Sequence, residues 1–185
     1  MMDRLNPRAR SDRFGSRLER RHSVTAATVI PWISIVVASV LPVFIIATAL
    51  PIVPPLGFVL FLSWRMVRPG LLPVWAGFPL GAVDDLFNGQ PFGFAIMAWS
   101  LAMLAIDAIE AWFPWRSFVL DWITAAVIIV LYVLSGVVLS GAVLSGPLFA
   151  AALPQMVFAV LIVPVAARLV ARLDRLRLRR WRAAS

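Results

Sequence analysis

The sequence has no cysteine and only one histidine, His22. Without thiols the chain forms no disulfide, and it has neither a thiolate nucleophile nor cysteine ligands for a metal. It also lacks the sequence motifs of phosphate-binding loops, dinucleotide-binding turns, zinc peptidases and serine hydrolases. No acidic residue is arranged with a histidine or a lysine that would complete a catalytic set. We therefore expect a protein that is not an enzyme, with no cofactor and no metal.

Charged residues are scarce in the middle of the chain. Residues 29–167 hold three arginines and five acids, whereas residues 1–28 and 168–185 hold seven arginines each. Hydrophobic residues make up 62% of the sequence, compared with about 45–50% in ordinary soluble domains. Arginines that flank apolar runs indicate membrane anchoring, and they lack the interleaved aromatics of a nucleic-acid surface. The composition predicts an integral membrane protein with no nucleic-acid partner.

Apolar runs define the predicted fold. They lie at residues 29–50, 54–67, 71–87, 92–113, 118–144 and 147–168. A spanning helix needs about 20 residues, so the second and third runs are short. A segment in lipid must satisfy its own backbone hydrogen bonds, and the alternating pattern of a membrane β-barrel is absent from this sequence. The prediction is an all-α bundle of about six transmembrane helices.

The placement of arginine predicts on which side of the membrane each turn lies, because cytoplasmic loops retain positive charge during insertion. Arg65, Arg68 and Arg116 put two turns inside, whereas the turns near residues 52, 88 and 146 have no arginine and should lie outside. We expect a multi-pass inner-membrane protein with both ends in the cytoplasm. Its predicted parts are a basic N-terminal arm at 1–28, a six-helix transmembrane domain at 29–168 and an Arg-rich tail at 169–185.

The Arg-rich ends are expected to lie on anionic lipid. Each arginine near a membrane surface contributes about 1 kcal/mol to such binding. The tail is predicted to continue the last helix out of the bilayer. The alternative is that it docks on a cytoplasmic partner.

One stretch at the end of the third apolar run has an unusual spacing. Small or acidic residues recur at every fourth position: Gly77, Gly81, Asp85, Gly89 and Gly93. In a helix this spacing keeps the first three near one face, where missing side chains let another helix approach closely. The outer turn then needs Gly89 and Gly93 for backbone freedom, while Pro91 restricts the loop between them.

Asp84 and Asp85 end the helical part of this stretch. An ionised aspartate near mid-bilayer costs about 2.5–3.5 kcal/mol on insertion scales, so both should face protein or water. Adjacent residues point about 100° apart on a helix and do not form a pair that shares one proton. The favoured interpretation is a hydrogen-bonded acid that braces the outer turn. A partner or ligand contact and a proton or cation relay are the alternatives.

Asp107 and Glu110 are three residues apart, hence on one helical face near a predicted cytoplasmic end. Acids there oppose the helix dipole unless a cation compensates them. The arginines of the predicted inner turns, which include Arg65 and Arg68, are expected on the same cytoplasmic side and could compensate these acids. The prediction is structural ion pairing, and Asp121 is interpreted in the same way.

The motif Gly81-x-x-x-Asp85-Leu86-x-x-Gly89-x-Pro91-x-Gly93, between the third and fourth apolar runs, resembles MreD, the integral membrane protein of the bacterial rod-shape system. The motif covers 13 residues, and the rest of the middle region is similar by pattern only. The sequence departs from the family in its long Arg-rich ends and in a second acid, Asp84. Asp85 has the register of the family's acid.

The resemblance implies a non-enzymatic scaffold of the elongasome that supports lateral peptidoglycan synthesis and cell shape. Its implied partners are an MreC-like membrane protein, RodA, the elongation penicillin-binding protein and MreB filaments. The implied partner-binding or structural motif is Gly81, Asp84, Asp85, Gly89, Pro91 and Gly93.

The family is also thought to be similar in fold to the substrate-binding subunits of energy-coupling-factor transporters. The resulting alternative is a vitamin-binding membrane subunit. An intramembrane enzyme and an ion carrier are weaker alternatives.

Overall fold

The computed structural model describes residues 24–45, 53–113, 117–139 and 146–177. Within these ranges all regular structure is helical, and no strand occurs. The prediction of an all-α protein is confirmed. The basic arm before residue 24, the turn near residue 52, Arg116 and the tail beyond residue 177 lie outside the described residues.

The described helices follow the predicted apolar runs. They are α1 (Val24–Ile45), α2 (Leu56–Val67), α3 (Gly77–Phe87), α4 (Phe94–Trp112), α5 (Phe118–Leu139) and α6 (Gly146–Arg177), with a short 3-10 helix η1 (Val74–Ala76) before α3. Three helical segments are long and apolar enough to cross a membrane: Phe94–Trp112, Phe118–Leu139 and Ala152–Leu176. The apolar part of α1 and the whole of α2 are shorter.

Several predicted boundaries were wrong. The first helix begins at Val24 and not at residue 29, and the run predicted at 71–87 becomes helical only at η1. Pro73 has an extended backbone (φ −65°, ψ 153°), and proline has no amide hydrogen to continue a helix. The fourth helix begins at Phe94 and not at residue 92, because Gly93 before it has a left-handed backbone. The last helix continues beyond residue 168 to Arg177, as expected for a helix that leaves the bilayer.

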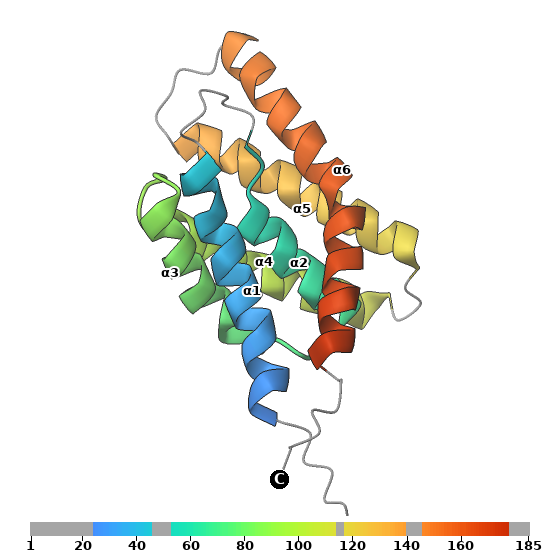
Figure 1. Ribbon diagram of the computed structural model, residues 1–185. Coiled ribbons are helices and arrows are strands. Elements are labelled where there is room, and N and C mark those ends of the chain that lie inside the picture. The colour runs from blue at the N-terminus through green and yellow to red at the C-terminus, as the bar shows by residue number, and fades with distance from the viewer. Residues whose placement is uncertain (1–23, 46–52, 114–116, 140–145, 178–185) are drawn as a thin grey trace, which may run out of the picture.

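Helix α2 is the centre of the bundle. All of its residues from Gly57 to Arg65 are buried, and Figure 1 shows it between α1 and α6. Twelve helical residues measure only about 18 Å, less than the roughly 30 Å of a hydrocarbon core. A helix that is apolar on every side is stable where protein surrounds it, so the neighbouring helices cover α2.

An aromatic cluster forms the core around α2. Phe58 stacks on Tyr132 of α5 with ring centroids 4.3 Å apart, and Trp99 of α4 lies 4.8 Å from Phe61 and 5.6 Å from Phe58. Such ring pairs contribute about 0.5–1.5 kcal/mol each beyond the area they bury. The cluster joins α2, α4 and α5 into one core.

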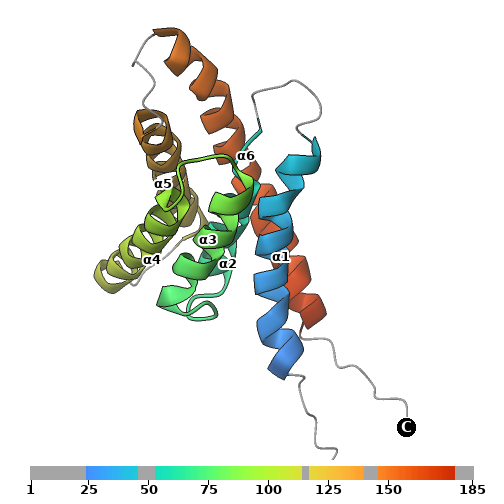
Figure 2. The same ribbon diagram turned by 90° about the vertical axis from the view of Figure 1, so that its left-hand side faces the viewer.

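The two ends of the bundle hold different connections. In Figure 2 the turn between α3 and α4 lies at the top, whereas the beginning of α1, the end of α6 and the connection from α2 to α3 lie at the bottom. The outer faces of α5 and α6 carry exposed apolar side chains such as Leu131, Leu161 and Val165. These faces have the character of a surface that meets lipid.

Candidate functional site

Helix α3 lies against α4 with almost no side chain between them. A Cβ atom placed on Gly81 would lie 2.6 Å from the carbonyl oxygen of Ala95 and 2.8 Å from the Cα of Ile96. A Cβ atom on Gly77 would lie 2.8 Å from the backbone of Trp99. Real Cβ atoms do not come this close to backbone, so the helices touch only because these positions are glycine. The predicted close approach is confirmed.

Asp85 caps helix α4 from the neighbouring helix. Its carboxyl group is buried and accepts hydrogen bonds from the amides of Gly93 (2.9 Å), Ala95 (2.8 Å) and Ile96 (3.2 Å). The first amides of a helix have no partner within it. Gly93, at the N-cap position, has no side chain with which to accept them. Asp85 therefore supplies the acceptor, and its charge lies at the positive end of the α4 dipole, which contributes about 0.3–2 kcal/mol.

The outer turn between the two helices depends on backbone shape. Gly89 has φ +65° and Gly93 has φ +97°, and nothing lies within 4 Å of a Cβ atom placed on either. L-residues rarely adopt these angles, so glycine is needed here for conformation and not for space. Pro91 is exposed, and its carbonyl oxygen accepts the amide of Phe94 at 3.0 Å. The predicted use of both glycines is confirmed.

Asp84 points in a different direction from Asp85. Its side chain is buried and accepts hydrogen bonds from the Asn88 amide group (2.6 Å) and from the Tyr132 hydroxyl of α5 (3.3 Å). The two acids are thus not a pair: Asp85 joins α3 to α4, and Asp84 joins it to α5.

The role of Tyr132 was not anticipated from the sequence. It is the chain's single tyrosine and lies in a long apolar run. A hydroxyl group buried in such surroundings needs a hydrogen-bond partner. That requirement pointed to a buried acceptor, although not to Asp84 in particular.

The predicted ion pairing lies at the C-terminal end of α2, away from the turn between α3 and α4. Arg65 donates to Glu110 of α4 through both of its terminal nitrogens (3.0 and 2.7 Å) and also pairs with Asp107. Arg68 pairs instead with the buried Asp174 of α6, at 2.8 and 2.6 Å. The pairing of Arg65 confirms the prediction, whereas the bond from Arg68 to α6 was not foreseen. Arg65 in the last turn of α2 and Arg68 directly after this helix thus hold α4 and α6.

The charged groups described above have their partners within the bundle. Both oxygens of Asp85 are occupied by backbone amides, and the Arg65 guanidinium is occupied by two carboxylates. Within the ranges that the structure describes, no three acidic or histidine side chains gather in a way that could hold a metal ion. The polar groups inside the bundle set the positions of its helices.

Comparison of the sequence with models of known protein families gave a match to one family. The family model described as rod shape-determining protein MreD matches residues 22–173, which include α1 to α5, the outer turn and most of α6. Comparisons with curated proteins and with solved structures gave no match.

Proposed function

Because this chain belongs to the MreD family of rod shape-determining membrane proteins, we propose that it is a non-enzymatic scaffold of the elongasome. It binds an MreC-like membrane protein and, in the same assembly, supports RodA and the elongation penicillin-binding protein in lateral peptidoglycan synthesis. Through these partners it is linked to cytoplasmic MreB filaments. The family match over residues 22–173 is the observation that carries this proposal.

The proposed topology is six crossings of the bacterial inner membrane with both termini in the cytoplasm. Its support is the separation of charge between the two ends of the bundle. Arg65 and Arg68 lie at the end of α2 from which the chain passes to α3, together with the start of α1 and the end of α6 (Figure 2). The turn at residues 88–93, at the opposite end, has no arginine. Positive charge marks the cytoplasmic side.

The outer turn is the proposed contact region for partners. Its shape is fixed by Asp85 and by the left-handed Gly89 and Gly93, and two large apolar side chains, Phe87 and Phe92, are exposed beside it. A rigid turn with exposed aromatic side chains suits binding, because little conformational entropy is lost when a partner docks.

We further propose that the bundle has the fold of the substrate-binding subunits of energy-coupling-factor transporters. A shared fold does not carry a shared function. The vitamin-binding alternative therefore has to be separated from the scaffold by experiment.

The test is affinity purification of the tagged full-length chain in mild detergent, followed by identification of bound proteins and small molecules. A scaffold should recover a single-pass MreC-like protein, retain no small molecule, and leave rounded cells when it is depleted. A tightly retained vitamin, together with a vitamin-transport defect in cells of normal shape, would overturn the proposal.

A further inference from the structure

A crevice of about 230 Å³ opens between α2, α5 and α6. Each helix contributes two apolar side chains to its walls: Met66 and Val67 from α2, Phe118 and Trp122 from α5, and Val163 and Ala167 from α6. It lies near the end of α2 and the beginning of α5, on the proposed cytoplasmic half of the bundle. It is separate from the outer turn and from the Arg65 ion pairs.

The crevice faces the surface that meets lipid. Phe118, one of the lining residues, is 62% exposed. In a membrane protein an apolar side chain exposed in this way contacts hydrocarbon and not water. Three polar residues, Ser63, Ser117 and Asp121, also line the crevice. Its occupant must therefore be apolar over most of the surface that it presents to the walls.

The walls favour a flexible occupant over another helix. Close packing of transmembrane helices uses small residues that let the backbones approach. Here two large side chains of α5, Phe118 and Trp122, line the crevice. Large side chains at these positions keep another helix backbone at a distance, whereas an acyl chain can bend around them.

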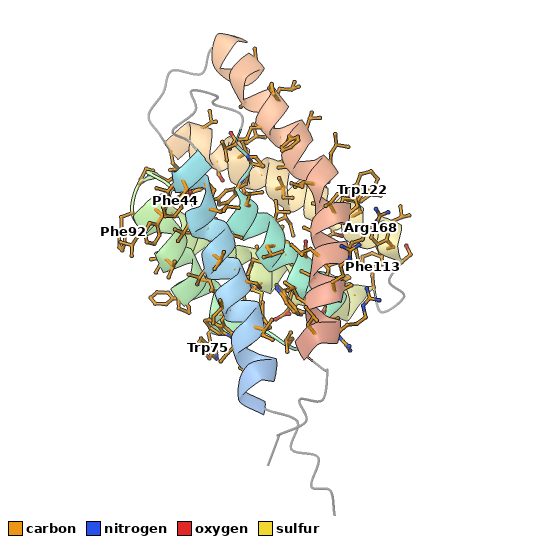
Figure 3. The ribbon with its side chains drawn as sticks, viewed as in Figure 1. Phe44, Trp75, Phe92, Phe113, Trp122 and Arg168 are labelled. Atoms are coloured by element: carbon orange, nitrogen blue, oxygen red, sulfur yellow. The ribbon has the colours of Figure 1, made fainter. Side chains whose placement is uncertain are left out.

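Two arginines follow the part of α6 that lines the crevice. Arg168 follows Ala167, and Arg172 lies one turn further along α6. Both are exposed, and neither forms an ion pair within the part of the chain that the structure describes. Figure 3 shows Arg168 and Trp122 on the same side of the bundle. Asp121, which also lines the crevice, would repel a phosphate, so an anionic group belongs on the α6 side.

We propose that this crevice binds one anionic phospholipid, with an acyl chain between α2, α5 and α6 and its phosphate on Arg168 and Arg172. The proposal deepens the general contact of the Arg-rich ends with anionic lipid into one defined site. It rests on the proposed topology only in placing the lipid in the cytoplasmic leaflet, and it does not depend on the identity of any protein partner.

Native mass spectrometry of the full-length chain provides the test. The purified protein is delipidated in detergent and then titrated with phosphatidylglycerol or with phosphatidylcholine, which has no net charge. We expect one phosphatidylglycerol to bind about tenfold more tightly than phosphatidylcholine, since each arginine near an anionic head group favours binding. Equal binding of the two lipids, or binding with no saturable first site, would overturn the proposal.

Two variants test the two halves of the site. Arg168→Gln combined with Arg172→Gln should remove the preference for phosphatidylglycerol, and Ala167→Phe, which fills the crevice, should weaken both lipids. Arg175→Gln is the matched control, because Arg175 is exposed on the same helix but lies further from Ala167. An equal effect of Arg175→Gln would show nonspecific attraction to the tail and would contradict the proposal. If Ala167→Phe does not fold, the double variant Arg168→Gln and Arg172→Gln still tests the proposed lipid site.

Recovery of the MreC-like protein from the same preparations separates this proposal from the scaffold function. Loss of the lipid preference with normal partner recovery supports the lipid site. If Ala167→Phe abolishes partner recovery while lipid binding is unchanged, the crevice is a protein interface and the lipid site is wrong. Failure of the unmodified chain to recover any partner counts against the scaffold and leaves the lipid measurement valid.

Discussion

The carboxyl group of Asp85 accepts a hydrogen bond from the amide of Gly93, eight residues later in the chain, at 2.9 Å. Gly93 presents this amide from a backbone with φ +97°, which a residue with a side chain rarely adopts. The next amides of α4 that Asp85 accepts are those of Ala95 and Ile96. The acid supplies the acceptor and the glycine supplies the shape, so neither is sufficient alone.

Asp85→Ala should lower the free energy of unfolding by about 2–4 kcal/mol, because a helix cap is lost and buried amides are left without an acceptor. Asp85→Asn, which retains one oxygen, should lose about half as much. The measurement is unfolding in mixed micelles by titration with dodecyl sulfate, followed by tryptophan fluorescence. Asp84→Ala is the neighbouring control and should cost less, since it removes the acceptor of two side-chain hydrogen bonds, and the half-buried Asn88 can turn to water. Asp85→Ala leaves three backbone amides without an acceptor. The reverse order of the two alanine variants would contradict the cap.

Gly81→Ala should separate α3 from α4 and cost about 1–3 kcal/mol, the usual range for overpacking. The added methyl group would meet the backbone of Ala95 and Ile96, which cannot move independently of α4. Gly136→Ala is the matched control. Its methyl group would lie 3.5 Å from the Phe94 ring in ordinary contact, and alanine is the better helix former. A neutral Gly81→Ala would show that the two helices are not held in contact.

Gly89→Ala should cost about 1–2 kcal/mol through backbone strain, although there is open space around this position. Gly89→Asn should cost less, because asparagine tolerates a left-handed backbone better than other residues with side chains. The same titration measures both variants. Equal losses for alanine and asparagine would indicate that something other than the φ angle determines stability here.

The sequence was sufficient to predict the α3–α4 hairpin because its requirements are local. Glycine spacing determines which face of α3 can approach a neighbour, and the glycine-proline turn limits the loop, so the roles of Gly81 and Gly93 could be predicted without knowing the fold. Asp84 and Asp85 were expected to brace the turn, but the sequence did not distinguish the one that accepts the amides of α4. The start of the third helix was missed because the apolar composition of residues 71–73 outweighed the effect of Pro73. Apolarity indicates burial in protein or lipid, but it does not show where the helix begins.

Contacts between distant helices could not be predicted to the same extent. Arg65 and Arg68 were correctly placed on the side of Asp107 and Glu110, but the bond from Arg68 to Asp174 joins residues 106 positions apart. Charge alone did not distinguish this partner from the others on the same side. The bond between Asp84 and Tyr132 depends in the same way on how α5 packs against α3.

Arg65→Gln should lower the free energy of unfolding by about 3 kcal/mol, because it leaves Asp107 and Glu110 close together without a compensating cation. Adding Asp107→Asn and Glu110→Gln should restore much of the loss, since the uncompensated charges are then removed. Arg175→Gln serves as a surface control and should be almost neutral. If the triple variant is no more stable than Arg65→Gln alone, the interaction that matters at Arg65 is not electrostatic.

The proposed topology can be tested cleanly because the chain has no cysteine. A single cysteine then becomes the only site for a thiol reagent that does not cross the membrane. Phe92→Cys lies in the outer turn at a position that is 72% exposed, and Pro69→Cys lies in the exposed connection that follows Arg68.

In intact spheroplasts the reagent should label Phe92→Cys and leave Pro69→Cys unlabelled, and permeabilised membranes should show labelling of both. The physical reason is that Arg65 and Arg68 resist translocation, whereas residues 88–93 carry no arginine. Labelling of the permeabilised samples controls for accessibility, so a protected Phe92→Cys in spheroplasts has only one meaning. It would place the turn at residues 88–93 in the cytoplasm, and an MreC-like partner could then not contact this turn from the periplasm.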